Sequence, residues 1–391
     1  MTEYQRPIVS RIFPRLTAIK TVLHIIIGPR QVGKTTAAQQ IAGQWNGPVI
    51  SVSADGPLPP DHTWIEVHWN RAATQKNSLL IIDEIQKING WSEAVKALWD
   101  RHLQSGNDMV VLLLGSSSLL LQKGVTESLA GRFLLHRFNH WSYSEMKAAF
   151  GYSLDEWLFF GGFPGTARFR SDEKLWAQYI RDSLIETVLA KDVLQMQSIA
   201  KPSLLRHLFM FAATYPAQIV SYNKMTGQLQ DAGNTTTLAH YLKLFDSAFL
   251  VSGLEQFKPG GHRKRGSSPK LILWNNALSS AILNIPFEQA REDHTLWGRL
   301  LENAVGGHLC SLLQGTLHEL YYWRNRDKEV DFVVRSPGKI YAIEVKSSQF
   351  EAPYGMTAFR KLCPDAVPMY IGEGGIPLEE FFKGNAEDYF K

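Results

Sequence analysis

The first 140 residues predict an α/β fold, because short apolar runs alternate with helical patterns. Four runs have the length of a strand, at residues 23–27, 49–52, 79–82 and 109–114. Several of them lack polar alternation, which is typical of parallel strands covered on both faces. Helical patterns at residues 35–44 and 92–104 fit between these runs. We therefore expect a parallel sheet flanked by helices.

After residue 142 the pattern changes, and helices predominate to about residue 200, broken by Gly-Gly-Phe-Pro-Gly at 161–165. Three further helices are expected from residue 202, the second at 221–232 and the third at 235–245. A strand pattern follows at 249–257. This order is the outline of a winged helix-turn-helix.

A segment rich in Gly, Pro, Ser and basic residues, at 258–270, separates this middle part from a last α/β part. The sequence therefore predicts three domains, at residues 1–141, 142–257 and 258–391.

The composition supports folded domains and excludes several classes of protein. Of 391 residues, 45% are hydrophobic and 20% charged, which excludes a disordered, collagen-like or disulfide-stapled chain. The net charge of +4 neither requires nor excludes nucleic acid. Cys310 and Cys363 are too few for a zinc site and favour a reducing compartment. With no signal peptide and no run able to span a bilayer, we expect a soluble cytoplasmic protein without a membrane partner.

A phosphate-binding loop follows the first predicted strand. Residues 28–35 fit the pattern G-x-x-x-x-G-K-[ST] between a strand and a helix. The two glycines allow backbone N–H groups to point at phosphate oxygens, and the helix adds its positive end. Lys34 is expected to reach the β- and γ-phosphates of ATP, and Thr35 to ligate Mg²⁺. The nucleotide-binding candidates are Gly28, Pro29, Arg30, Gln31, Val32, Gly33, Lys34, Thr35 and Thr36.

A second motif, Leu-Leu-Ile-Ile-Asp-Glu at residues 79–84, ends a buried strand with two carboxylates. Asp83 then lies at the edge of the sheet where α/β folds bind ligands, and it is a candidate for the Mg²⁺ shell. Glu84 is the candidate general base that polarises the attacking water. The alternative is an ordinary strand end with acidic capping residues, which the neighbouring phosphate loop disfavours.

Two more candidates follow the strand at 109–114. Ser116, in the run Gly-Ser-Ser-Ser, is a candidate sensor of the γ-phosphate; the alternative is a serine-rich turn. Arg132, at the end of Glu-Ser-Leu-Ala-Gly-Arg, is a candidate arginine finger for the nucleotide of a neighbouring subunit. Its alternative is an ordinary surface arginine.

In this order, GPRQVGKT, LLIIDEIQ, LLLGSSS, SLAGRF and GGFP resemble the motifs of the prokaryotic AAA-type ATPases. More narrowly, they resemble the subgroup with a C-terminal domain of unknown function, and the resemblance covers nearly the whole chain. It implies an AAA-like core, a helical segment, a winged helix and a restriction-nuclease-like end. It assigns phosphate and Mg²⁺ binding to Lys34 and Thr35, the Walker B pair to Asp83 and Glu84, the sensor position to Ser116 and the finger to Arg132.

The last part of the chain carries a second group of candidates. Two strand patterns are joined by a turn centred between residues 337 and 338. In the antiparallel register that this turn implies, Asp331 lies opposite Glu344, and Lys346 projects on the same face. A helix beginning near residue 300 would bring Glu302 close.

Two carboxylates and a lysine on one hairpin suit metal-assisted hydrolysis. Asp331 and Glu344 would hold Mg²⁺ near a scissile phosphate, and Lys346 would stabilise charge. Asp followed by Glu-x-Lys resembles the PD-(D/E)xK nuclease fold, in which Glu302 fits the preceding acidic helix position. The alternative is a cross-strand salt bridge on a solvated hairpin, and such folds also survive as binding modules.

Two regions are candidates for DNA contact. One is the basic cluster His262, Arg263, Lys264 and Arg265 with Lys258 and Lys270, for which the alternative is a solvated linker. The other is residues 235–237 with His240 and Lys243, as the exposed face of a recognition helix. For that face the alternative is a lid or a protein-contact surface.

The sequence thus predicts a Mg²⁺-dependent, ATP-hydrolysing, DNA-associated protein with a nuclease-like C-terminal domain. The alternative is an ATP-controlled protein-interaction switch whose C-terminal carboxylates are structural. The expected partners are ATP and either DNA or a protein, with a second copy of the chain if Arg132 acts in trans.

Overall fold

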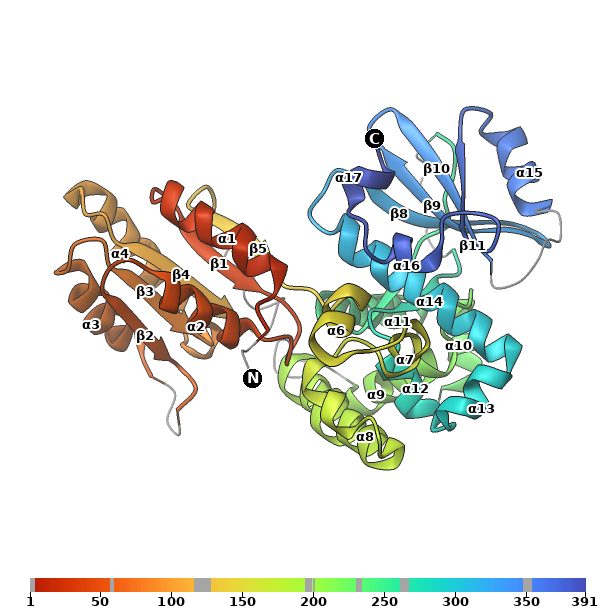
Figure 1. The fold of residues 1–391 in the computed structure, drawn as a ribbon, viewed down its shortest axis with the longest axis horizontal. Coiled ribbons are helices and arrows are strands. Elements are labelled where there is room, and N and C mark those ends of the chain that lie inside the picture. Colours follow the sequence, from red (N-terminus) through yellow and green to blue (C-terminus); the bar gives the residue numbers. More distant parts are fainter. Residues whose placement is uncertain are drawn as a thin grey trace. The chain divides into compact units, whose positions relative to one another are not determined.

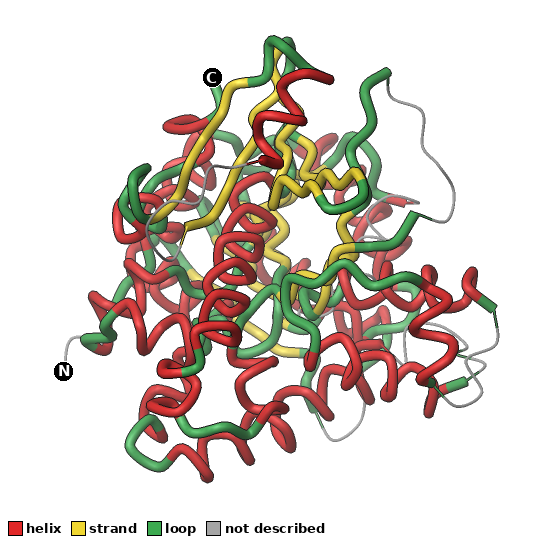
Figure 2. The backbone as a smooth tube through the Cα atoms, turned by 90° about the vertical axis from the view of Figure 1, so that its right-hand side faces the viewer, coloured by secondary structure: helices red, strands yellow, loops and turns green. Residues whose placement is uncertain are grey.

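The computed structural model describes residues 4–56, 60–115, 128–193, 199, 201–229, 234–260, 267–346 and 354–391. Contacts divide the chain into two compact units, Met1–Asn139 and His140–Lys391. Helices and strands contribute to both units (Figure 1), and a backbone trace coloured by secondary structure shows the same mixture (Figure 2). The division expected at residue 258, within the second unit, stays a prediction.

The first unit contains a parallel sheet with the strand order β2-β3-β4-β1-β5. Its strands are β1 (Leu23–Ile27), β2 (Val49–Ser53), β3 (Leu79–Asp83), β4 (Val110–Gly115) and β5 (Phe133–Arg137). The predicted α/β class is confirmed, and the four predicted strands are present with ends that differ by at most one residue. The apolar patterns do not predict β5.

Helices cover both faces of this sheet (Figure 1). They are α1 (Pro7–Ala18), α2 (Lys34–Gln44), α3 (His62–Ala73), the short η1 (Ile85–Lys87) and α4 (Trp91–Ser105). Ile25 of β1 packs with Trp69 of α3 and Trp99 of α4 in one buried apolar cluster. Helices α1 and α2 contact each other and lie over the opposite face. The result is the three-layer arrangement that apolar parallel strands require.

The second unit begins with the helices predicted after residue 142. They are α6 (Tyr143–Phe150), α7 (Leu154–Phe160), η2 (Pro164–Phe169), α8 (Glu173–Tyr179) and the π-helical η3 (Ile180–Ile185) and η4 (Val188–Val193). Ser142 and Ser153 cap α6 and α7 by exchanging hydrogen bonds with the glutamate three residues later. The predicted break follows α7, where a Cβ on Gly162 would lie 2.1 Å from the carbonyl oxygen of Trp141.

Three helices and a strand come next, in the order expected from the sequence, and a second strand, which was not predicted, pairs with the first in an antiparallel sheet. They are α9 (Pro202–Thr214), α10 (Tyr222–Gln228), α11 (Thr235–Ser247), β6 (Val251–Leu254) and β7 (Lys270–Leu273). An isolated antiparallel pairing of Ile219 with Lys270 lies beside this sheet. The loop between β6 and β7 therefore starts and ends at paired strands.

The last part of the chain forms a four-stranded sheet of order β11-β10-β9-β8. Its strands are β8 (Glu319–Asn325), β9 (Lys328–Ser336), β10 (Lys339–Lys346) and β11 (Val367–Gly372). Strand β11 runs parallel to β10, and the other neighbours are antiparallel. The helices here are α12 (Ala277–Leu283), α13 (Phe287–Glu292), α14 (His294–Leu313), α15 (Tyr354–Leu362), α16 (Leu378–Phe381) and α17 (Ala386–Tyr389).

Two of these helices cover opposite faces of the sheet. Helix α14 packs Leu301 and Val305 against Ile343 of β10, whereas α15 packs Phe359 against the neighbouring Ala342. Because successive side chains of a strand point to opposite faces, the two helices form separate layers.

The hairpin of β9 and β10 has the register that the turn predicted. Ser336 pairs with Lys339, and the same register continues to Phe332 and Ile343. On its other side, β9 changes register against β8 between Tyr321 and Trp323. This β-bulge lies at residues 331 and 332 of β9, and bulges re-aim the side chains that they carry.

Candidate nucleotide site and carboxylate cluster

The phosphate loop lies between β1 and α2, where the motif placed it. Residues 28–33 form the turn, and Lys34, Thr35 and Thr36 form the first turn of α2. Gly33 has φ of 86°, a conformation that favours glycine. A Cβ on Gly28 would lie 2.0 Å from the carbonyl oxygen of Phe138, so no side chain fits there. Both glycines are thus required by the backbone that the motif needs.

The ammonium group of Lys34 lies inside this loop. Its Nζ donates hydrogen bonds to the carbonyl oxygens of Gly28, at 3.0 Å, and Pro29, at 2.6 Å. The side chain is buried at the positive end of α2. This combination of a buried cation, a helix N-terminus and a glycine turn attracts an anion such as a phosphate.

Thr35 and Asp83 are in direct contact. The hydroxyl of Thr35 donates a 2.6 Å hydrogen bond to Oδ2 of Asp83, which is the last residue of β3. Oδ1 of Asp83 accepts a hydrogen bond from the backbone N–H of Glu84 at 2.8 Å. Hydroxyl and carboxylate oxygens are ligands that Mg²⁺ accepts, so these two side chains fit the predicted metal role.

Glu84 lies directly after β3 in a left-handed backbone conformation, with φ of 54°. This backbone conformation turns the side chain of Glu84 away from the direction of β3. Oε2 of Glu84 accepts a 2.7 Å hydrogen bond from Nε2 of Gln86 in η1. The sequence analysis missed Gln86, although it stands in the motif and fixes the direction of the candidate base.

Arg132 does not lie at the phosphate loop of its own subunit. Its backbone accepts a hydrogen bond from Leu23 at the start of β1, and the loop begins at the other end of that strand. Five residues of strand span roughly 15 Å. The guanidinium group makes two hydrogen bonds to the carboxylate of Asp100, at 2.8 and 3.2 Å. Only a second copy of the chain could therefore use Arg132 as a finger, and Ser116, the sensor candidate, lies outside the described residues.

Arg6 is a further residue at the phosphate loop, and the motif does not include it. It is 6% exposed and donates a 3.0 Å hydrogen bond to the carbonyl oxygen of Val32, within the loop. A second hydrogen bond, of 3.2 Å, goes to the carbonyl oxygen of Asn139. The guanidinium also lies 5.3 Å from the ring centre of Phe138. Arg6 thus ties the phosphate loop to the segment after β5.

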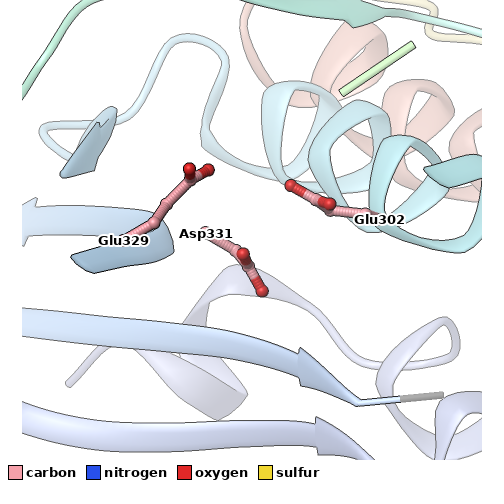
Figure 3. A group of neighbouring side chains, drawn as sticks. All are labelled: Glu302, Glu329 and Asp331. Atoms are coloured by element: carbon pink, nitrogen blue, oxygen red, sulfur yellow. The ribbon is translucent and has the colours of Figure 1, made fainter. Parts of the chain in front are cut away.

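The C-terminal carboxylates form a group that differs from the predicted one. Carboxylate oxygens of Glu302, Glu329 and Asp331 lie within 4.8 Å of one another. The carboxylate of Glu302 points from α14 toward the strand that carries the other two (Figure 3). Sequence analysis missed Glu329, which lies two residues before Asp331 on β9 and belongs to no motif.

The ammonium group of Lys270 lies among these three carboxylates. Its Nζ is 3.0 Å from Oε1 of Glu329 and 3.9 Å from Oδ1 of Asp331, and it forms an ion pair with Glu302. The side chain of Lys270 is completely buried. The sequence analysis grouped Lys270 with an exposed basic cluster, and that placement is wrong because β7 buries the residue. The other members, at 262–265, lie outside the described residues.

Glu344 and Lys346 lie on the other side of Asp331. Oδ2 of Asp331 accepts a 2.8 Å hydrogen bond from the backbone N–H of Val345, and Lys346 Nζ is 3.4 Å from Oε2 of Glu344. Burial raises the pKa of Glu344 to about 7, and the charge of Asp331 adds to the shift. Oε1 of Glu344 is buried without a hydrogen-bond partner among the described residues. The hairpin thus brings Asp331 and Glu344 together, as its register predicts.

The candidate recognition face of α11 is accessible to solvent. Thr235, Thr236, His240 and Lys243 are exposed, whereas Leu238 and Tyr241 are buried. Asn234 caps the helix by accepting a hydrogen bond from the backbone of Thr237. None of the helices in the described part of the chain has the length and apolar character of a membrane span.

Three family models match successive parts of the chain. Residues 20–147 match an AAA domain, residues 151–289 a domain of unknown function (DUF8612), and residues 297–381 another domain of unknown function (DUF4143). The N-terminal part is therefore similar to AAA domains, as its motifs implied. The expected winged helix and nuclease-like end go beyond what these matches show.

Similar proteins were found among curated sequences and solved structures. An uncharacterized protein of Haemophilus influenzae is 24% identical over an alignment of 293 residues that covers 72% of this chain and 68% of that protein. The Walker-type ATPase PABY2304 of Pyrococcus abyssi is 13% identical with a TM-score of 0.49, covering 72% of this chain and 96% of that one. The RuvB Holliday junction branch migration motor of Thermotoga maritima is 14% identical with a TM-score of 0.37, covering 68% and 92%.

Proposed function

We propose that the N-terminal unit binds and hydrolyses ATP with Mg²⁺. The contact between Thr35 and Asp83 carries this proposal, because it joins the hydroxyl and carboxylate ligands of a nucleotide-bound Mg²⁺ at the edge of the sheet. The adjoining loop supplies N–H groups and the buried Lys34 for the phosphates.

Each residue of the site then has a definite task. When ATP binds, the ammonium group of Lys34 gives up its hydrogen bonds to the carbonyl oxygens of Gly28 and Pro29. It donates instead to oxygens of the β- and γ-phosphates. Glu84 accepts a proton from the attacking water, and Gln86 keeps its carboxylate in place. Mg²⁺, when bound, supplies charge neutralisation at the phosphates.

Two substitutions test this assignment. Lys34→Ala should abolish ATP binding, and Glu84→Gln should retain binding while hydrolysis falls by about 100-fold or more. Lys96→Ala, which removes an exposed lysine of α4, is the matched control and should change neither. Isothermal titration gives the binding constants and phosphate release gives the rate. Unchanged ATP affinity in Lys34→Ala would mean that the loop is not the phosphate site.

We further propose that residues 202–273 form a winged helix and that the C-terminal part is a nuclease-like domain in contact with DNA. The order α9, α10, α11, β6, β7 and the exposed polar face of α11 support the first. The helix α14, the antiparallel strands β8 to β10 and the acidic residues on them support the second. Fold alone does not supply an activity, so the two parts need separate tests.

The test is binding and cleavage of duplex, single-stranded and branched DNA with Mg²⁺ or Mn²⁺. Wild type is compared with Glu344→Ala and with Lys243→Ala on α11. Cleavage that Glu344→Ala removes would support nuclease chemistry, and weaker binding in Lys243→Ala would support contact through α11. If wild type neither binds nor cleaves any of these substrates, the nucleic-acid proposal fails.

One observation favours the second candidate function, an ATP-controlled protein-interaction switch. The ammonium group of Lys270 lies among Glu302, Glu329 and Asp331, and Asp331 is one of the two predicted Mg²⁺ ligands of this part of the chain. A domain whose carboxylates are already neutralised in this way has a structural role for them. Retained ATP hydrolysis together with the absence of any DNA binding would support this function over the first.

A further inference from the structure

Lys270 is a fully buried lysine whose partners come from two other elements. The lysine begins β7, whereas Glu302 lies on α14 and Glu329 and Asp331 lie on β9. Besides the three carboxylates, Nζ donates a 3.1 Å hydrogen bond to the backbone carbonyl oxygen of Asp331. It also lies 5.0 Å from the ring centre of Phe332. Every contact of the ammonium group is therefore with an anion, a carbonyl or an aromatic face.

Three carboxylates this close repel one another unless a cation lies between them. Burial by itself lowers the pKa of Lys270, but the charges of Glu302, Asp331 and Glu329 outweigh it and raise the pKa above the ordinary lysine value. A buried lysine without such partners would lose its proton readily.

We propose that Lys270 is the resident cation of this carboxylate cluster and excludes divalent metal ions from it. The inference rests on the proposal that these carboxylates belong to a nuclease-like domain. It deepens that proposal, since it states what controls the access of metal ions to them. A Mg²⁺ or Mn²⁺ ion bound in this cluster would need oxygens of Glu302 and Asp331 as ligands, and both acids are engaged by the lysine. The predicted metal pair of Asp331 with Glu344 shares Asp331 with the cluster.

The geometry makes the two occupants mutually exclusive. A hard divalent cation requires carboxylate oxygens at about 2.0–2.6 Å from a common centre. The ammonium nitrogen lies among the same oxygens, in an ion pair with Glu302 and 3.0 and 3.9 Å from oxygens of Glu329 and Asp331. Nothing but a displacement of the lysine side chain would free the position, and β7 holds its backbone by pairing with β6 at Leu254. The contact is thus autoinhibitory toward metal-assisted chemistry.

The test is a titration of the full chain with Mn²⁺. The electron paramagnetic resonance signal of the free ion measures how much Mn²⁺ is bound. All proteins carry Asp83→Asn and are measured without nucleotide, so that the metal ligands proposed beside the phosphate loop do not contribute. The parent protein should show no saturable binding at the cluster. Lys270→Met, which keeps the length of the side chain but removes the charge, should gain about one Mn²⁺ per chain. Adding Asp331→Asn should remove that gain, and Lys339→Met, at an exposed lysine of β10, should give none.

Two results would overturn the proposal. One is saturable Mn²⁺ binding by the parent that Asp331→Asn abolishes, and the other is a folded Lys270→Met protein that gains no Mn²⁺. If Lys270→Met does not fold, the double variant Lys270→Met/Glu302→Gln decides, because it removes one anion with the cation. Recovery of cooperative unfolding in the double variant supports the cation role, and failure to recover contradicts it.

The outcome is separate from that of the proposed function. ATP hydrolysis is tested through Lys34 and Glu84, in the other unit of the chain. A Lys270→Met protein that gains Mn²⁺ but cleaves no DNA leaves the inference in place and removes nuclease chemistry. Cleavage that appears only in Lys270→Met supports both.

Discussion

The hydroxyl of Thr35 and Oδ2 of Asp83 are 2.6 Å apart, which joins the first turn of α2 to the end of β3. Two segments 48 residues apart in the sequence are thereby held together before any nucleotide binds. The two oxygens that we propose as ligands of one Mg²⁺ ion are in contact, so this proposal requires little rearrangement of either segment.

Asp83→Asn should separate metal-dependent from metal-independent binding of ATP. The amide keeps the shape of the carboxylate but loses the charge that Mg²⁺ requires. We expect the affinity for ATP with Mg²⁺ to fall by about 10-fold, since hydrogen bonds to charged groups contribute about 1.5–3 kcal/mol. Affinity measured in EDTA should change little. Titration calorimetry of Glu66→Gln, at an exposed position of α3, is the control. Equal losses with and without Mg²⁺ would contradict the metal role.

Arg6→Ala should weaken nucleotide binding although Arg6 lies outside the motif. Removing the guanidinium leaves the carbonyl oxygen of Val32 without this donor and loosens the loop that directs N–H groups at phosphate. A charge-assisted hydrogen bond of about 1.5–3 kcal/mol corresponds to a loss of at least 10-fold in ATP affinity. Arg11→Ala, on the exposed side of α1, should bind ATP as wild type does. Equal affinities of the two variants would show that Arg6 does not position the loop.

Mixing two inactive variants tests whether Arg132 acts on another subunit. The Lys34→Ala variant lacks a working phosphate site but keeps Arg132. The Arg132→Ala variant lacks the arginine but keeps the phosphate site. If Arg132 acts in trans, the mixture should hydrolyse ATP faster than either variant alone. The structural alternative predicts no recovery, because the pair of Arg132 with Asp100 lies within one chain. In that case Asp100→Ala and Arg132→Ala should lower the melting temperature to a similar extent.

The histidine pair on β1 and β5 predicts a loss of stability in mild acid. Nδ1 of His24 is 3.0 Å from Nε2 of His136, and the two rings are stacked. Burial lowers the pKa of His136 to about 3, and the neighbouring charges of His24 and Arg15 add to the shift. The unfolded chain therefore takes up this proton first, at its ordinary pKa near 6.5. Stability should be complete above pH 6.5 and decrease toward pH 3 by about 1.4 kcal/mol per pH unit for this group.

Urea unfolding between pH 7 and pH 5 measures this slope. His136→Leu should flatten the dependence, whereas His62→Gln, at the exposed first residue of α3, should leave it as in wild type. A slope that is the same in all three proteins would exclude the buried pair as its source.

The central strands were predictable because burial on both faces makes them continuously apolar. Strands β1, β3 and β4 lie inside the sheet and are such runs, except for His24 within β1 and Asp83 at the end of β3. Strand β5 is at an edge and is only partly buried, and its last two residues, His136 and Arg137, are polar. A short edge strand of this composition resembles a loop when only the sequence is considered.

The phosphate loop was predictable for a different reason: its chemistry lies in eight consecutive residues. Arg6 and Lys270 could not be found in this way, because tertiary packing brings them to partners distant in sequence. Lys270 stands 32 residues before Glu302 and 59 before Glu329. Its position at the end of a basic segment indicated solvent exposure, and only the pairing of β7 with β6 shows that it is buried. Residue type and spacing therefore located the local site but not the cluster assembled across elements.

The contact between Arg6 and Val32 also bears on where the nucleotide-binding part of the chain can be cut. The match to an AAA domain begins at residue 20, which leaves α1 and Arg6 outside it. A fragment designed to that limit would expose the sheet face that Val9, Ile12 and Leu16 of α1 help to cover. It would also lose a donor to its phosphate loop. A recombinant fragment intended for nucleotide-binding work should therefore start before Arg6, with any affinity tag separated from it by a spacer.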